Sequence, residues 1–229
     1  MSGQPSPPSP RRRRAWKEEV RRGWNRASFV YRPRRATQDL FGHASMEYRE
    51  WLRPLLTNLP RGARVLDLGC GNGIPAARLL STRFRLTGVD ISDTQLRRAR
   101  RLVPGAHFLR ADLAEVDFAP ESFEAVLSLY ALIHVPREEH RAVFRRVFHW
   151  LAPGGWFLVI VGEERYEGRQ SNWLGSEAPM RWSHYDAATY RRWFPSEGFR
   201  IVRDSFVPEG DGGHRLFLAR KRRRRTGTP

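Results

Sequence analysis

Cysteine is nearly absent from this sequence, which contains a single one, Cys70. One cysteine excludes an intramolecular disulfide framework and any metal site built from several cysteines, so we expect no bound metal. Long apolar runs are also absent, since none approaches the roughly 20 residues that a membrane helix needs. The N-terminus is rich in proline, serine and then arginine, without the apolar segment of a secretory signal. These absences predict a cytoplasmic protein with no membrane partner.

Lysine is scarce as well. Only Lys17 and Lys221 are lysines among the 41 basic residues, and the formal net charge is +17. Nine of the positive charges lie in two runs, residues 11–14 and 221–225, beside proline, serine, glycine or threonine. Such runs are usually solvated and disordered, and the arginine bias extends over the whole composition. This distribution disfavours, without excluding, a nucleic-acid partner.

The most informative stretch is residues 65–73, which read Val-Leu-Asp-Leu-Gly-Cys-Gly-Asn-Gly. An apolar strand runs into an acid and three closely spaced glycines, which let the backbone turn sharply and approach a ligand. A dinucleotide fingerprint would need glycine at the position of Ile74. The carboxylate of Asp67 suits a cationic ammonium, whereas a carboxylate beside a pyrophosphate is unfavourable. The loop therefore favours a cofactor with an amino-acid end over NAD.

Further segments follow in a fixed order. Residues 85–90 predict a second strand that ends in Asp90, 23 residues after Asp67, which is the spacing of a carboxylate that binds ribose hydroxyls. Residues 123–128 predict a fourth strand, followed by Leu-Tyr-Ala-Leu-Ile-His-Val, and residues 151–158 read Leu-Ala-Pro-Gly-Gly-Trp-Phe-Leu. Over roughly residues 60–162 the chain resembles the class I S-adenosylmethionine-dependent methyltransferases, and residues 65–73 are similar to their motif I.

The resemblance implies S-adenosylmethionine as the cofactor. It places Asp112, after a third strand at 106–110, where an acid accepts a hydrogen bond from the adenine amino group. It implies an α/β fold with a Rossmann-like seven-stranded sheet in the order 3-2-1-4-5-7-6, an antiparallel last strand and helices on both faces. The cofactor-binding residues that it implies are Asp67, Gly69, Cys70, Gly71, Gly73, Asp90, Ile91, Asp112, Leu113 and Leu129.

We expect one methyltransferase domain at residues 15–220, between basic tails at 1–14 and 221–229. Its predicted parts are an N-terminal helical lid at 15–59, a cofactor-binding core at 60–162, a substrate-side segment with the last helix at 163–198 and a final hairpin at 199–220. Residues 163–183 have no clear periodicity and are interpreted as an irregular insertion. The connection at 208–213 is too short for a crossover helix, so the two last strands must be antiparallel.

Two residues are candidates for the chemistry. An apolar stripe among the arginines of the first helix includes Trp16, Trp24 and Tyr31. The stripe is explained by packing alone, but family resemblance implies that such helices close over the cofactor, with an aromatic residue near the sulfonium. Tyr31 is that candidate, because an aromatic face attracts a cation. His134, just beyond the fourth strand, is the candidate general base for a hydroxyl acceptor, with a packing role as the alternative.

The acceptor is narrowed by elimination. Cytosine C5 methylation needs a cysteine after the fourth strand, and the chain has none there. Exocyclic amine methylation of bases typically shows an Asp/Asn-Pro-Pro-aromatic turn, where this chain has Ser128-Leu129-Tyr130-Ala131. Tryptophan and tyrosine at 173–193 suit either a wall for a small aromatic acceptor or ordinary packing. We predict methyl transfer to O or N of a small molecule. The alternatives are a nucleic-acid-directed methyltransferase or binding module and an NAD-binding oxidoreductase.

Overall fold

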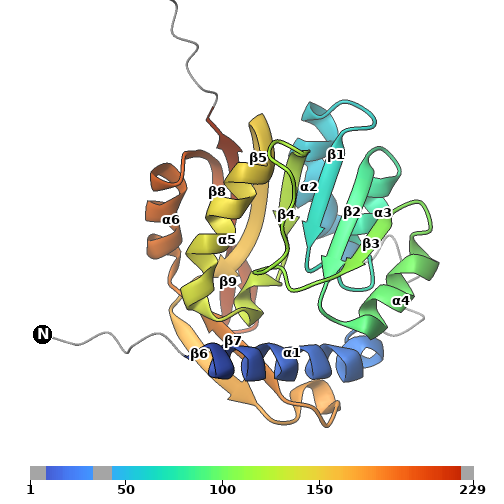
Figure 1. The fold of residues 1–229 in the computed structure, drawn as a ribbon, viewed down its shortest axis with the longest axis vertical. Helices are drawn as coiled ribbons and strands as arrows, with labels where there is room; N and C mark the ends of the chain where they lie inside the picture. The colour runs from blue at the N-terminus through green and yellow to red at the C-terminus, as the bar shows by residue number, and fades with distance from the viewer. Residues whose placement is uncertain (1–8, 33–42, 223–229) are drawn as a thin grey trace, which may run out of the picture.

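Seven strands form one central sheet in the computed structural model, which describes residues 9–32 and 43–222 (Figure 1). The strands are β1 Arg64–Leu68, β2 Arg85–Asp90, β3 His107–Arg110, β4 Phe123–Ser128, β5 Leu151–Gly162, β8 Phe199–Glu209 and β9 Gly212–Lys221. Their order across the sheet is β3-β2-β1-β4-β5-β9-β8. Because β6 and β7 lie in a separate hairpin, this is the predicted order 3-2-1-4-5-7-6, and the fold class is confirmed.

The direction of the strands also agrees with the sequence. β1 is parallel to β2 and β4, whereas β9 is antiparallel to both β5 and β8. The connection expected at 208–213 is shorter in the structure, where only residues 210 and 211 separate β8 from β9. The parallel strands therefore direct all their carboxyl ends to one edge of the sheet, where ligands bind in open α/β folds.

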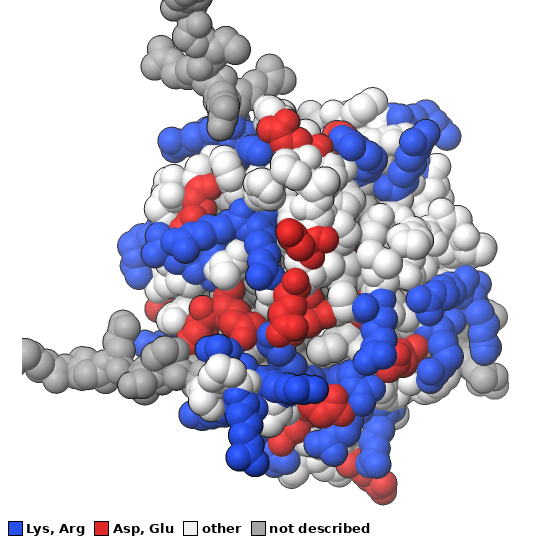
Figure 2. Space-filling model, in the orientation of Figure 1, with Lys and Arg blue, Asp and Glu red and all other residues white. Residues whose placement is uncertain are grey.

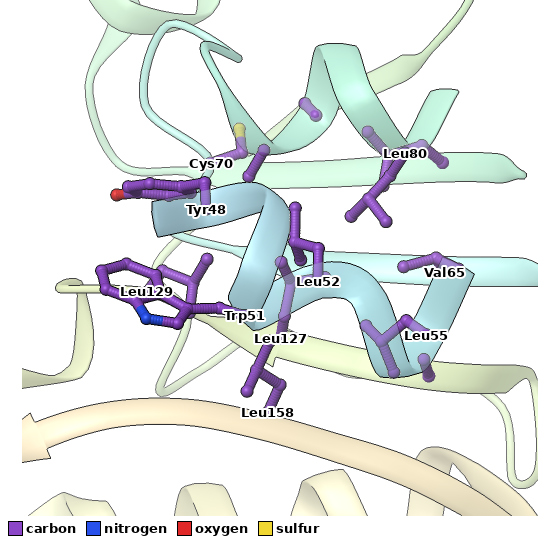
Figure 3. Close-up of a cluster of buried hydrophobic side chains, with 14 of the residues drawn as sticks. Tyr48, Trp51, Leu52, Leu55, Val65, Cys70, Leu80, Leu127, Leu129 and Leu158 are labelled. Carbon is purple, nitrogen blue, oxygen red and sulfur yellow. The ribbon is translucent and has the colours of Figure 1, made fainter. Parts of the chain in front are cut away.

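Helices cover both faces of this sheet. Alternate strand residues point to opposite faces, so Val65 packs on one side and Leu66 on the other. The first face is covered by α2 His43–Asn58, α3 Ala76–Ser81 and α4 Asp93–Leu102, and the second by α5 Arg137–Trp150 and α6 Ala187–Ser196. Figure 3 shows Leu52 and Leu55 of α2 beside strand residues such as Val65. Thus α2, expected within a lid, covers a sheet face, since its leucines are buried there.

The N-terminal helix α1 runs from Pro10 to Tyr31, so the prediction of a tail is wrong for residues 10–14. The Ser9 hydroxyl accepts a hydrogen bond from the amide of Arg12 (3.4 Å), and Pro10 occupies the first turn. Arginine is a good helix former, so the charge run that suggested disorder extends the helix. At the other end β9 includes Lys221, whose amine donates to the carbonyl oxygen of Leu151 (2.6 Å). Residues 1–8 and 223–229 of the predicted tails lie outside the described residues.

Residues 163–183 are not irregular, because β6 Tyr166–Gln170 pairs antiparallel with β7 Met180–His184. The strand β6 is exposed along most of its length, so its sequence lacks the alternation of apolar and polar residues that identifies a strand. The helix α1 lies against this hairpin across the carboxyl ends of the sheet strands (Figure 1). We call α1 and residues 166–184 the roof. No helix among the described residues is both long and apolar enough to cross a membrane.

Candidate functional site

A cavity with about 970 Å³ of empty space, including its open mouth, lies between α1 and the carboxyl ends of the central strands. Nine of the ten predicted cofactor residues line it, and these are Asp67, Gly69, Cys70, Gly71, Asp90, Ile91, Asp112, Leu113 and Leu129. Tyr31 and His134 line the same cavity. The fold therefore brings together residues that are up to about a hundred positions apart in the chain.

Gly73 is the exception, because it is not among the residues that line the cavity. Its φ is +81°, and a Cβ there would lie 3.0 Å from a methyl of Val103 and 3.6 Å from the side chains of Ala77 and Ala99. Gly73 thus has a packing role, and its contact with the cofactor stays a prediction. Glycine at this position allows α3 and α4 to approach the loop.

The other two glycines shape the wall of the cavity. Gly69 has φ +79°, and a Cβ there would overlap the side chain of Ala131, which follows β4. The amides of Gly69 and Cys70 donate to the carbonyl oxygen of Val89, at 2.7 and 3.0 Å. These bonds fix the loop after β1 against the end of β2. Burial raises the pKa of the Cys70 thiol well above its usual value, so the thiol stays protonated and is a poor nucleophile.

Two acids stand side by side at this edge. Asp67 is 2% exposed, and its Oδ2 atom has no hydrogen-bond partner among the described residues. Burial, and then the neighbouring charge of Asp90, raise the pKa of Asp67 to about 7. Asp90 accepts hydrogen bonds from the amides of Gly71 and Ser92, both at 2.8 Å. Burial raises its pKa to about 6 against the opposing effect of these donors. A buried unpartnered carboxylate oxygen favours a cationic or hydrogen-bond-donating ligand.

The far end of the cavity contains Asp112. Its Oδ1 atom accepts from the amide of Ala114 at 2.8 Å, and its Oδ2 atom pairs with the amine of Lys17 at 2.7 Å. Apolar side chains of Ile91, Leu113 and Leu129 line the cavity with it. The sequence pattern identified the acid but gave no sign of its partner, because Lys17 belongs to a distant helix.

The roof is anchored by contacts between side chains that are distant in the sequence. The indole of Trp16 donates to the carbonyl oxygen of His134 at 2.9 Å. Glu19 receives hydrogen bonds from Arg181 at 2.6 Å and from Arg169 at 3.1 Å, both in the hairpin. Nearer the end of α1, the Ser28 hydroxyl donates to the side-chain oxygen of Gln95 at 2.7 Å. The helix is thus anchored to η1 (Leu132–His134), to β7 and to α4.

His134 is buried, and its protonation state is defined by its surroundings. Its Nδ1 atom lies 2.7 Å from the carbonyl oxygen of Arg181. Because a carbonyl only accepts, Nδ1 carries the proton and Nε2 keeps its lone pair in the neutral ring. Burial lowers the pKa of His134 to about 4, so the imidazole is neutral at pH 7. The ring is surrounded by Trp24 at 5.5 Å and Trp182 at 5.7 Å between centroids.

Tyr31 lies on the same side of the cavity and is 40% exposed. Its ring meets that of Trp24 edge to face at 5.1 Å and lies 6.0 Å from that of Trp173. The guanidinium of Arg32 lies 5.2 Å from the Tyr31 centroid. Tyr31 therefore belongs to a group of aromatic rings at the open side of the cavity.

Several lining residues were missed by sequence reasoning: Lys17, Trp24, Arg32, Tyr48, Asn72, Gln95 and Tyr130. Tyr130 has φ +60°, a left-handed conformation that is uncommon for a bulky residue and often occurs at ligand sites. Its ring packs against His214 at 5.2 Å. Tyr130 stood within the segment that resembled the family, but a positive φ leaves no signature in a tyrosine. Trp24 showed only helical periodicity, which does not distinguish a cavity wall from a core.

Comparison with known proteins agrees with this geometry. A family model described as a methyltransferase domain matches residues 65–155. Trans-aconitate 2-methyltransferase of Paracidovorax citrulli (strain AAC00-1) is 37% identical over 145 residues, which make up 60% of this chain and 55% of that protein. Sterol 24-C-methyltransferase of Candida albicans (strain SC5314 / ATCC MYA-2876) is 32% identical over 140 residues, or 56% of this chain and 36% of that protein.

A solved structure resembles nearly the whole chain. It is the 1,6-didemethyltoxoflavin-N1-methyltransferase of Burkholderia thailandensis with bound 1,6-didemethyltoxoflavin and S-adenosylhomocysteine. The TM-score is 0.67 at 21% identity, over 96% of this chain and 94% of that one. Residues 65–155 thus match a methyltransferase domain, and solved structures of the same fold hold bound S-adenosylmethionine or S-adenosylhomocysteine. The match spans about half of the length of the first relative and about a third of the second.

Proposed function

We propose that the protein transfers a methyl group from S-adenosylmethionine to an oxygen or nitrogen atom of a small molecule. The observation that carries this proposal is the unpartnered Oδ2 atom of buried Asp67. Asp67 lies beside the glycine turn, and we call Asp67, residues 69–71 and Asp90 the floor of the cavity. An amino-acid ammonium supplies both the positive charge and the hydrogen bonds that this carboxylate lacks. A pyrophosphate supplies neither, so the same atom argues against NAD.

The residues present fit the rest of the cofactor. Asp90 would accept hydrogen bonds from the ribose hydroxyls, since each carboxylate oxygen retains accepting capacity beyond its one amide partner. Ile91, Leu113 and Leu129 would hold the adenine ring, and Asp112 would accept from its amino group. Aromatic rings around Tyr31 would face the sulfonium, whose charge an aromatic face stabilises.

The acceptor side is aromatic. Trp24, Tyr31, Tyr48, Tyr130 and His134 line the cavity with their rings. Such walls bury a flat or partly apolar molecule and leave few partners for several carboxylates. We therefore favour an acceptor with an aromatic body and a nucleophilic O or N, and we disfavour an aliphatic polycarboxylate.

The methyl group on a sulfonium is already activated, so the protein has mainly to orient the nucleophile and exclude water. The roof would serve both ends, because α1 contributes Lys17, Trp24 and Tyr31 to the lining of the cavity and the hairpin packs against this helix. Neutral His134 would accept a hydrogen bond at Nε2 from the N–H or O–H group of the acceptor. This bond would orient the lone pair of the acceptor atom toward the methyl group. Its low pKa makes it a weak base, which suits an amine acceptor better than an alcohol.

A nucleic-acid substrate remains the second candidate because of the basic face over α1 and α4. Figure 2 shows acidic side chains interspersed among the basic ones on this face. Many of the arginines are paired, as Arg13 is with Glu139 (3.3 Å) and both Arg21 and Arg110 are with Asp93 (3.1 and 3.2 Å). Pairing of this kind interrupts the continuous positive potential that tracks a phosphate backbone.

Transfer of labelled methyl groups tests the proposal. The full-length protein is incubated with methyl-labelled S-adenosylmethionine and, separately, with planar nitrogen heteroaromatics and phenols, with aliphatic carboxylic acids, and with RNA. We expect labelling in the first set and calorimetric binding of S-adenosylhomocysteine. Labelling of RNA alone would favour the nucleic-acid alternative. Binding of NAD without binding of S-adenosylhomocysteine would overturn the proposal.

A further inference from the structure

The two lysines of the chain occupy unusual positions among 39 arginines. Both are nearly buried, with side-chain exposures of 12% for Lys17 and 10% for Lys221. Lys221 lies at the end of β9, beside the carbonyl oxygen of Leu151 and away from the cavity lining. Lys17 lies in α1 and lines the cavity. A composition that otherwise uses arginine thus has lysine where a compact cation fits a confined space.

Lys17 is surrounded by three carboxylates. Its Nζ atom lies 2.7 Å from Oδ2 of Asp112, 2.7 Å from Oε2 of Glu139 and 3.0 Å from Oε1 of Glu115. An ammonium has three donors around a point charge, which matches three separate oxygens, whereas the planar fork of arginine matches one carboxylate. Burial works against the charge of Lys17, but the hydrogen bonds that its ammonium donates to Asp112 and Glu139 outweigh it and raise the pKa of Lys17. The amine therefore stays charged at any physiological pH.

These contacts join three elements that meet at one end of the cavity. Lys17 comes from α1, Asp112 and Glu115 follow β3, and Glu139 lies in the first turn of α5. The amide of Ala114 fixes the Oδ1 atom of Asp112, and Lys17 fixes Oδ2. The orientation of the Asp112 carboxylate is thus determined jointly by its own loop and by the roof helix.

We propose that Lys17 is a positioning residue that holds Asp112 for the base of the cofactor and so couples the docking of α1 to cofactor capture. This inference rests on the proposed binding of S-adenosylmethionine in the cavity. Asp112 without Lys17 would lose its nearest cation and one of its two fixed contacts, and its carboxylate would turn toward solvent. The base would then lose an oriented acceptor, and α1 would lose its link to the loop after β3.

The test uses binding, which does not depend on an identified acceptor. Calorimetry measures the affinity of the full-length protein and of the variants Lys17→Met, Lys17→Arg and Lys221→Met for S-adenosylhomocysteine. The same titrations use S-inosylhomocysteine, in which a carbonyl oxygen replaces the amino group. We expect Lys17→Met to weaken binding of S-adenosylhomocysteine by about tenfold and to reduce the preference for it over the inosine analogue. Lys17→Arg should fall between this variant and the natural protein.

Lys221→Met is the matched control, because it removes the other buried lysine far from the cavity. It should lower the thermal midpoint and leave affinity and base preference unchanged. If the natural protein does not bind S-adenosylhomocysteine, the proposed function fails. If it binds, and folded Lys17→Met keeps both the affinity and the preference, the role of Lys17 is overturned while the proposed function stands. Should Lys17→Met not fold, unchanged affinity and preference in Lys17→Arg would overturn that role equally.

Discussion

The floor and the roof of the cavity are built from different kinds of contact. At the floor, the loop after β1 is fixed by main-chain bonds to Val89 and by a bond from Gly71 to Asp90, partners only about twenty positions apart. In the roof, Trp16 bonds to His134 across 118 positions and Glu19 meets Arg181 across 162 positions. The floor is therefore a local motif that one strand-turn-helix unit can specify, whereas the roof exists only after distant segments have packed together.

The two sides also differ in electrostatics. Burial raises the pKa values of Asp67 and Asp90 at the floor. A ligand that brings a positive charge or hydrogen-bond donors would stabilise their charged forms. Burial lowers the pKa of His134 on the roof side, where aromatic rings surround it. The floor therefore favours a cationic group of the ligand, and the roof side favours a neutral ring system. The division suits a fold whose similar proteins are named for different acceptors, because the acceptor side can be rebuilt without altering the floor.

The largest expected effect comes from Asp67→Asn at the floor. This change removes the carboxylate that would meet the ammonium, so we expect affinity for S-adenosylhomocysteine to fall on the order of 100-fold, or about 2.7 kcal/mol. The ligand-free protein should instead become more stable, because a buried unpartnered charge is removed. Calorimetry and the thermal midpoint measure the two effects. Weaker binding together with a lower midpoint would show that Asp67 stabilises the fold and would remove the basis of the comparison.

The pH dependence of the same variant gives a second measurement. An acid with a raised folded pKa contributes stability that is present below its unfolded pKa, about 4. That contribution is lost as the pH rises through its folded value, about 7 for Asp67. The ligand-free natural protein should thus lose stability between pH 5 and pH 7, and Asp67→Asn should show a smaller loss. Asp211→Asn, in the exposed turn before β9, is the control and should keep the natural slope.

The contrast between floor and roof also explains what could be predicted. Asp67 and Asp90 were predictable because glycines and acids within one βαβ unit follow local rules, whereas the strand order was predicted from the family resemblance. The strand β6 was missed because an exposed strand buries too little on either side to show a pattern. The role of Lys17 was missed for a different reason, because it depends on three carboxylates that only the tertiary structure brings together. The packing of Gly73 against α3 and α4 was not predicted, because spacing alone does not distinguish a glycine that faces a ligand from one that faces a helix.

A smaller effect is expected from Gly23→Ala in α1, and its sign is informative. In an isolated helix this change stabilises by about 1 kcal/mol. Here the new Cβ would lie 2.6 Å from the carbonyl oxygen of Pro179 and 2.8 Å from Cε of Met180. We expect overpacking to outweigh helix propensity and to destabilise the protein by roughly 1 to 2 kcal/mol. Chemical denaturation measures the change. Gly105→Ala, where a Cβ meets nothing within 4 Å, is the control. A more stable Gly23→Ala protein would show that α1 does not dock on the hairpin.

Tyr31→Leu tests whether the exposed rings of the roof act on the reaction. Tyr31 is only partly buried, so its loss should change the free energy of unfolding by less than about 0.5 kcal/mol. If its ring faces the sulfonium, methyl transfer should slow by about tenfold, which corresponds to about 1.4 kcal/mol. Tyr31→Phe keeps the ring and should retain most of the rate. Equal rates in the leucine and phenylalanine variants would assign Tyr31 to packing.

His134→Gln is expected to have the smallest effect on rate, about threefold or less with an amine acceptor, because a neutral imidazole with a pKa of about 4 is a weak base at pH 7.

The contribution of His134 to the pH dependence of stability should have the opposite sign to that of Asp67. A histidine with a lowered folded pKa contributes stability that is present above its unfolded pKa, about 6.5. That stability is lost as the pH falls toward 4, so the variant should lose less stability than the natural protein between pH 6.5 and pH 4.5. Turnover against pH and thermal midpoints against pH measure both. An inflection in turnover near pH 6.5 that disappears in His134→Gln would show that this imidazole titrates as an exposed base, and the orienting role would then be wrong.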